Sequence, residues 1–104
     1  MILKLGSDGI TTLEEPEVFS RFHCEIDEAF GSIETARAQL APVAEIESRE
    51  VAWVDNEALL ALGAPLVPDA AAWKTSVQSM LDKAARYGWV REQSPSIKSH
   101  IVWR

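Results

Sequence analysis

The chain has 104 residues, of which 47% are hydrophobic and 25% are charged, and its net charge at pH 7 is −6. This length and composition predict one globular domain with a single hydrophobic core, and they exclude a disordered or low-complexity chain. The acidic balance argues against general nucleic-acid binding, because affinity for phosphates depends on Lys and Arg.

The longest weakly polar run covers residues 58–68 and contains a glycine and two prolines. A membrane-spanning helix needs about 18 to 20 apolar residues, so we expect no membrane insertion. Cys24 has no partner for an internal disulfide, and the first residues contain no signal-type apolar stretch. These features predict a cytoplasmic protein.

Charge is distributed unevenly along the chain. Residues 1–73 contain 14 acidic and 4 basic residues, whereas residues 74–104 contain 6 basic and 2 acidic residues. Such an asymmetry can be satisfied inside one fold, between copies of it, or by a partner.

The first elements expected are a hairpin and a strand. Apolar runs at 2–5 and 10–13 flank a four-residue loop that begins and ends with glycine, which is a hairpin signal. Pro16 and its acidic neighbours then interrupt the sheet. From 18 to 27 apolar and polar side chains alternate, which predicts a strand with one buried face.

The middle of the chain predicts a helix, a strand and a short helix. Ser32 can cap a helix over 33–41, which ends at Pro42 or bends onward to residue 46. Residues 51–54 form an apolar strand. A short helix over 57–62 follows and is closed by Gly63.

The clearest element is a helix over 70–87, capped by Asp69 and followed by Gly88. Its apolar positions recur at helical spacing and predict one buried stripe. The stripe consists of Trp73, Val77, Met80, Leu81, Ala84 and Tyr87.

A second hairpin is expected at the end of the chain, with strands at 89–92 and 97–103 around a loop at 93–96. The order of elements favours an α+β fold. We therefore expect a single domain over 1–104, with a mainly antiparallel sheet and two main helices on one of its faces.

Cys24 lies beside His23 in the sequence, which suggests a catalytic nucleophile with its base, but the strand geometry argues against this pair. Adjacent residues of a strand point to opposite faces, so Cys24 should enter the core while His23 turns away. Free cysteine is also among the most frequently buried residue types. We therefore expect a structural Cys24.

The polar face of the strand at 18–27 presents a ladder of alternate side chains: Arg21, His23, Glu25 and Asp27. A histidine beside a carboxylate can act as a general base. The alternative is a solvated sheet face whose ion pairs are each worth about 0 to 1 kcal/mol. Phe19 shares this face, and an exposed aromatic residue there suggests cover by a helix, a ligand or a second subunit.

The last strand adds Lys98, His100 and Arg104 on its outward face. If it pairs with the strand at 18–27, His23 and His100 converge. The resulting hypothesis has His23, Glu25 and His100 as catalytic residues. Its ligand-binding residues are Arg21, Asp27 and Lys98, and the ligand is a small anion.

No metal or cofactor is expected. Two histidines far apart without a ligand-spaced motif do not predict a metal site. The absence of a glycine-rich phosphate loop argues against the common nucleotide-dependent enzymes. Among the tryptophans, Trp73 is predicted to be in the core, whereas Trp103 is a candidate interface residue because a terminal strand is often at a sheet edge.

Three functional hypotheses follow. The first is an interaction or accessory protein that forms a homodimer or binds a protein partner. The alternative is a cofactor-independent small-molecule-binding protein or enzyme that uses His23 and His100. A remote alternative is a winged-helix DNA binder formed by 55–104, although the loop at 63–69 is longer than the about 3 to 4 residues of that motif.

Overall fold

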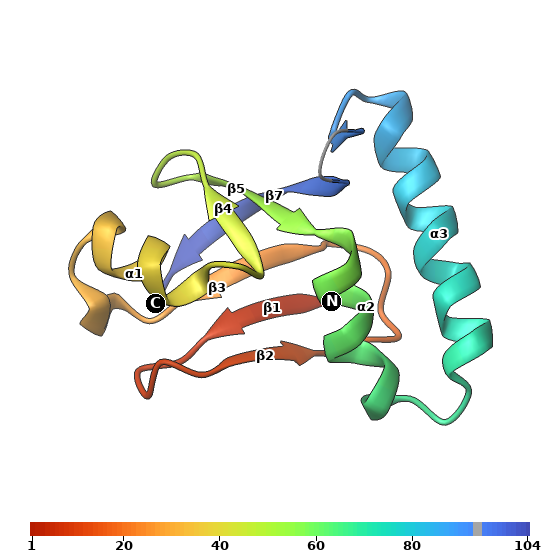
Figure 1. The fold of residues 1–104 in the computed structure, drawn as a ribbon, viewed down its shortest axis with the longest axis horizontal. Coiled ribbons are helices and arrows are strands. Elements are labelled where there is room, and N and C mark those ends of the chain that lie inside the picture. Colours follow the sequence, from red (N-terminus) through yellow and green to blue (C-terminus); the bar gives the residue numbers. More distant parts are fainter. Residues whose placement is uncertain (93–94) are drawn as a thin grey trace.

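The computed structural model describes residues 1–92 and 95–104, and over these residues the chain forms one sheet of seven strands with three α-helices (Figure 1). In chain order the elements are β1 (Ile2–Leu5), β2 (Thr11–Glu14), β3 (His23–Ile26), α1 (Ile33–Leu40), β4 (Ala44–Ile46), β5 (Val51–Asp55), α2 (Asn56–Gly63), α3 (Ala70–Arg86), β6 (Val90–Arg91) and β7 (Ser96–Trp103). Short 3₁₀ helices cover Glu28–Phe30 and Ala64–Leu66. The α+β class is confirmed.

The sheet is mixed, so the expectation of a mainly antiparallel sheet is wrong. Its strand order is β2-β1-β3-β7-β5-β4, and β6 also pairs with β7. β3 runs parallel to both β1 and β7, while the other four pairs are antiparallel. Alternation along a strand shows which side chains share a face, but it carries no information about strand direction.

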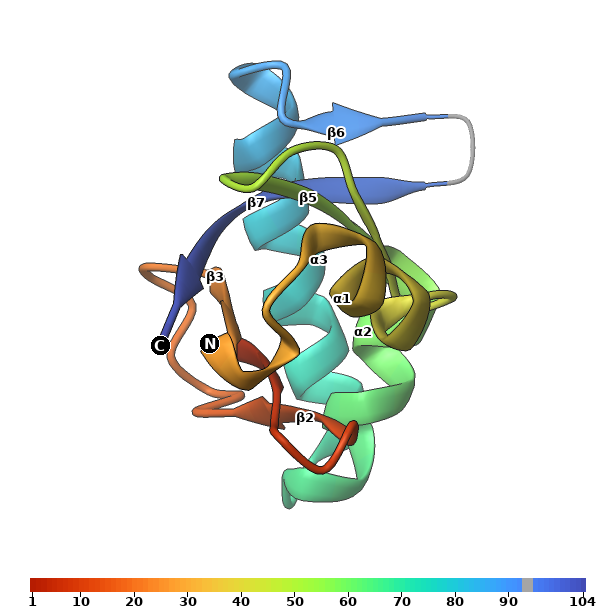
Figure 2. The ribbon, with the colours of Figure 1, turned by 90° about the vertical axis from the view of Figure 1, so that its left-hand side faces the viewer.

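The two main helices do not lie side by side, although both bury residues in the same core. Figures 1 and 2 show α1 and α3 at opposite ends of the strands, and the sheet curls between them. α2 contacts both β2 and β5, although three strands separate these two in the sheet. The helix can bridge them because the curl brings the two sides of the sheet toward one another.

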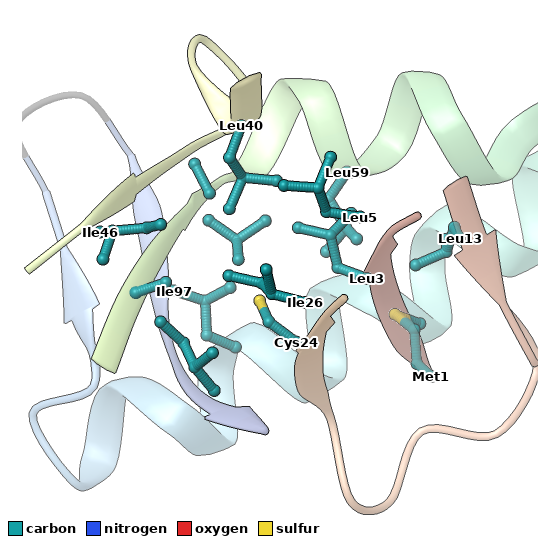
Figure 3. Close-up of a cluster of buried hydrophobic side chains, with 14 of the residues drawn as sticks. Met1, Leu3, Leu5, Leu13, Cys24, Ile26, Leu40, Ile46, Leu59 and Ile97 are labelled. Carbon is teal, nitrogen blue, oxygen red and sulfur yellow. The ribbon is translucent and has the colours of Figure 1, made fainter. Parts of the chain in front are cut away.

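The core occupies the inside of this curl (Figure 3). It receives alternate side chains from most of the strands, and each fully buried Leu or Ile contributes roughly 1.5 to 3 kcal/mol. The inward residues of the strands are Leu3, Leu5, Leu13, Cys24, Ile26, Ala44, Ile46, Ala52, Val54, Ile97 and Ile101. From α3 the core receives Trp73, Val77, Leu81 and Ala84, which confirms most of the predicted stripe, whereas Tyr87 is 70% exposed.

The caps predicted at Ser32 and Asp69 are confirmed, and Asp55 is a third cap that was not predicted from the sequence. The side chains of Ser32, Asp55 and Asp69 accept hydrogen bonds from the backbone N–H groups of the first turns of α1, α2 and α3. Each cap of this kind is worth about 1 kcal/mol. A continuation of the first helix to Ile46 is wrong, because α1 ends before Pro42 and the chain then forms β4 against β5.

The strand expected at 18–27 is shorter than its alternation suggests, because β3 begins only at His23. Arg21 has a φ of 58°, in the left-handed region, which no extended strand can include. The residues before it bond outside the sheet instead. The carbonyl of Pro16 accepts from Trp73 Nε1 at 2.7 Å, and that of Val18 accepts from the Met1 amino group at 2.6 Å.

β7 is an interior strand, so the edge position expected for the C-terminal strand is wrong. β5 pairs along one side of β7, and two short strands share its other side. On that side β6 pairs with Ser96 and Ile97, whereas β3 pairs from His100 onward. A junction therefore lies near Lys98 and Ser99, where neither strand continues.

The predicted hairpin around residues 93–96 is confirmed for its strands β6 and β7. Gln93 and Ser94 of its expected loop lie outside the described residues.

Cys24 is buried in the core, as predicted (Figure 3). Burial desolvates the thiolate and raises the pKa of Cys24 to about 11, while a hydrogen bond with Ser99 acts in the opposite direction. A thiol held in its neutral form is a poor nucleophile, so Cys24 is a core residue rather than a reactive one.

Replacing Gly63 by alanine should destabilise the protein by about 1 to 3 kcal/mol, because the added Cβ would overlap the indole of Trp73. Helix propensity alone predicts the opposite, since Ala is favoured over Gly in a helix by about 0.5 to 1 kcal/mol. Urea denaturation measures the difference. In a Trp73→Phe background the smaller ring should reduce the cost, and an unchanged cost there would contradict the overlap.

At Arg21, the glycine variant should be more stable than the alanine variant by about 1 kcal/mol, because left-handed backbone is unfavourable for residues with a Cβ. Both variants lose the same guanidinium, so their difference in urea denaturation reports the backbone. At Lys74, inside α3, the same two substitutions should rank in the reverse order. Equal stability of the two Arg21 variants would contradict strain at this position.

The free energy of unfolding should fall between pH 9 and pH 11 by up to about 2 to 3 kcal/mol through Cys24. The folded state holds the thiol proton more tightly than the unfolded state. Its contribution is therefore complete below pH 9 and is lost as the pH rises through 11. Urea denaturation of wild type and Cys24→Ala across this range isolates the effect, and parallel pH profiles would refute it.

Candidate functional site

A cavity of about 830 Å³ lies at the junction beside β7, between that strand and α3. Its walls come from α3, the segment before β3, β5, β7 and the turn after α3. The lining residues are Phe19, Arg21, Phe22, Val51, Ser76, Ser79, Met80, Lys83, Ala84, Tyr87, Trp89, Ile97, Lys98, Ser99 and His100.

The local structure explains how these side chains reach one place. The lining residues of α3 and its C-cap recur at spacings of three and four, next to the stripe that enters the core; they are Ser76, Ser79, Met80, Lys83 and Tyr87. One face of the helix thus packs into the core, and the neighbouring face lines the cavity.

The turn at Arg21 supplies the opposite wall. Extending the parallel register of His23 with His100 backward would place Phe22 beside Ser99 and Arg21 beside Lys98. The left-handed backbone at Arg21 stops this pairing. Residues that would have closed the sheet line the cavity instead.

The charges around the cavity are of one sign. Arg21, Lys83 and Lys98 line it, together with His100, and among the residues that the structure describes no carboxylate does so. The ion pairs found in residues 1–92 and 95–104 use other basic side chains, namely Lys4, His23, Arg91 and Arg104. A protein with a net charge of −6 therefore has a locally basic cavity.

An aromatic pair stands at the cavity and is largely in solvent. The rings of Tyr87 and Trp89 stack with centroids 4.8 Å apart and planes 24° from parallel. Gly88 between them has a φ of 75°, and this left-handed turn reverses the chain after α3. Tyr87 is 70% exposed and Trp89 is 47% exposed, so the core does not account for this pair.

The structure brings some of the sequence-predicted site residues together and separates others. Arg21, Lys98 and His100 all line the cavity. His23 is the partner of His100 in the β3–β7 register, as expected if these strands pair, yet it does not line the cavity.

His23 instead belongs to a network on the outer side of β3. Its Nδ1 lies 2.8 Å from the carbonyl oxygen of Arg21, and its Nε2 lies 3.4 Å from Glu25 Oε2. The other oxygen of Glu25 pairs with Arg104 Nε at 2.6 Å. Both ring nitrogens of His23 thus face protein atoms, and the network joins β3 to the last residue of the chain.

The remaining two predicted residues have structural contacts. Asp27 Oδ1 accepts a hydrogen bond from Ala29 N and caps the 3₁₀ helix that follows β3. Trp103 is half-buried, donates from Nε1 to the carbonyl of Arg49 at 2.8 Å, and stacks under the Arg49 guanidinium at 4.4 Å. Neither residue lines the cavity.

Sequence reasoning did not identify the contribution of α3. Lys83, Tyr87 and Trp89 were not proposed as site residues, and Tyr87 was placed in the buried stripe. A signal was present, because Ser76, Ser79 and Lys83 form a polar line directly beside that stripe. Whether such a polar line faces solvent or a cavity depends on the elements that pack beside the helix, and the helix sequence does not reveal them.

Two other kinds of site were sought in the part of the chain that the structure describes. No group of three or more His, Cys, Asp or Glu side chains there could hold a metal ion. No helix within those residues has the length and apolarity to cross a membrane.

Known proteins provide no further guide: no family model, no curated protein and no solved structure matches the chain. The functional argument therefore rests on the geometry and chemistry of the cavity.

Proposed function

We propose that this protein binds a small organic anion, with an apolar body and a carboxylate or phosphate group, in the cavity between α3 and β7. The observation that carries this proposal is the gathering of Arg21, Lys83 and Lys98 around apolar walls, without a carboxylate among the described lining residues.

The size and lining of the cavity suit a small molecule. Ligand sites in proteins are commonly about 300 to 1,000 Å³, mostly apolar, with a few polar groups that fix orientation. Here Phe19, Phe22, Met80 and Ile97 offer apolar contacts, and the hydroxyl-bearing side chains are Ser76, Ser79 and Ser99. An apolar body of moderate size would bury surface against these walls.

The cations provide the preference for an anion. They come from three separate parts of the chain, so no local sequence pattern requires their proximity. Like charges that are close together repel one another, and a bound anion would relieve this repulsion. Because all three side chains are exposed, each should contribute about 0 to 1 kcal/mol, and added salt should weaken the effect.

Binding is favoured over catalysis by the surroundings of the histidines. A general base needs reach to the ligand and a partner that orients it. His23 has the partner Glu25 but does not line the cavity, whereas His100 lines it without an ion-pair partner among the described residues. The two requirements are thus met by different residues.

Self-association and binding of a protein partner stay predictions. Trp103 was proposed as an interface residue because a terminal strand is often at the edge of a sheet. The strand that carries it, β7, lies inside the sheet. The cavity is formed within one chain, so the proposed binding does not depend on a second copy.

Lys98→Gln should weaken binding of 8-anilinonaphthalene-1-sulfonate, an apolar fluorescent anion, by about two- to fivefold, because one nearby cation is removed. Fluorescence titration of the folded protein measures the affinity. Lys74→Gln removes an exposed cation that does not line the cavity and is the matched control. Equal affinities of the two variants, or no binding by the wild type, would refute the proposal.

A further inference from the structure

We infer that the ligand of this cavity is a planar aromatic anion that stacks on the Tyr87–Trp89 pair, with its acidic group held by the lysines beside that pair. This inference rests on the proposed function and names its ligand class.

The first support is the exposure of the aromatic pair. Two stacked aromatic residues gain about 0.5 to 1.5 kcal/mol beyond their buried area. With 70% of Tyr87 and 47% of Trp89 exposed, however, much of their apolar surface stays in water. Exposed aromatic surface that adjoins a cavity is typical of binding sites. A planar ligand would cover this surface and extend the stack.

The second support is the position of the two lysines. Lys83 lies in the last turn of α3, four residues before the C-cap Tyr87, a spacing that places the two on one side of the helix end. Lys98 N–H donates to the Trp89 carbonyl at 2.7 Å, so Lys98 and Trp89 are neighbours just beyond the paired residues of β6 and β7. Lys83 is therefore one helical turn from Tyr87, and Lys98 is bonded through its backbone to Trp89.

The combination discriminates between aromatic and aliphatic ligands. Phe22, Met80 and Ile97 can pack against either kind of apolar group, whereas the stacked pair of rings gains most from a third flat ring. The acidic group of a ring stacked on Trp89 or Tyr87 would come within reach of Lys98 or Lys83. Arg21 bounds the same cavity and would add to its positive potential.

The decisive measurement compares two anions with the same number of carbons and one carboxylate each, 2-naphthoate and undecanoate, by calorimetric titration of the full chain. The aromatic anion should bind about three- to tenfold more tightly, the ratio that stacking energies predict. Undecanoate binding as tightly as 2-naphthoate, or more tightly, would overturn the inference while the proposed anion site stands. Absence of binding by both anions and by the fluorescent probe would overturn the proposed function as well.

Variants test the stack directly. Trp89→Leu should reduce 2-naphthoate affinity by about three- to tenfold and change undecanoate affinity less than about twofold, because only the stacking contact is lost. Tyr87→Leu, at a more exposed position, should act in the same direction. Trp53→Leu removes a tryptophan that does not line this cavity and should change neither affinity. An equal loss for both anions in Trp89→Leu would overturn the aromatic preference.

Discussion

Strand β7 can form backbone hydrogen bonds with a neighbouring strand on each of its two sides, and on one side two strands share it. β5 covers one side of β7, whereas β6 and β3 divide the other between them. A longer β3 would compete with β6 for the same edge, because its backward register leads to Lys98, whose N–H already bonds to Trp89. Since buried backbone groups must find partners, this competition limits both strands and leaves the junction where the cavity lies.

Arg21 is the residue at which the competition is resolved. Its left-handed backbone is unfavourable for a side chain with a Cβ, by roughly 1 to 2 kcal/mol, yet it directs the preceding segment away from β7. The segment is then held by Trp73 and by the Met1 amino group, and it places Phe19 in the cavity wall. Backbone strain of this kind is frequently found at binding and catalytic sites.

The uneven charge of the sequence is partly resolved inside the fold. Arg91 pairs with Glu45 and Glu47, and Arg104 pairs with Glu25, so C-terminal bases meet N-terminal acids. These pairs leave Lys83 and Lys98 at the cavity together with Arg21. The cavity is therefore basic because these three cations form no ion pair with the described residues, and not because of the overall composition.

The sequence by itself determined the local features of this protein. Helical spacing and caps located α3 and the start of α1, and alternation placed Cys24 in the core, because these depend on neighbours within a few residues. Strand direction, the early end of β3 and the interior position of β7 depended on pairing between distant segments. Only the tertiary structure could therefore bring Arg21, Lys83 and Lys98 together and place His100, but not its strand partner His23, at the cavity. Register and curl are fixed by the competition of whole strands for one sheet.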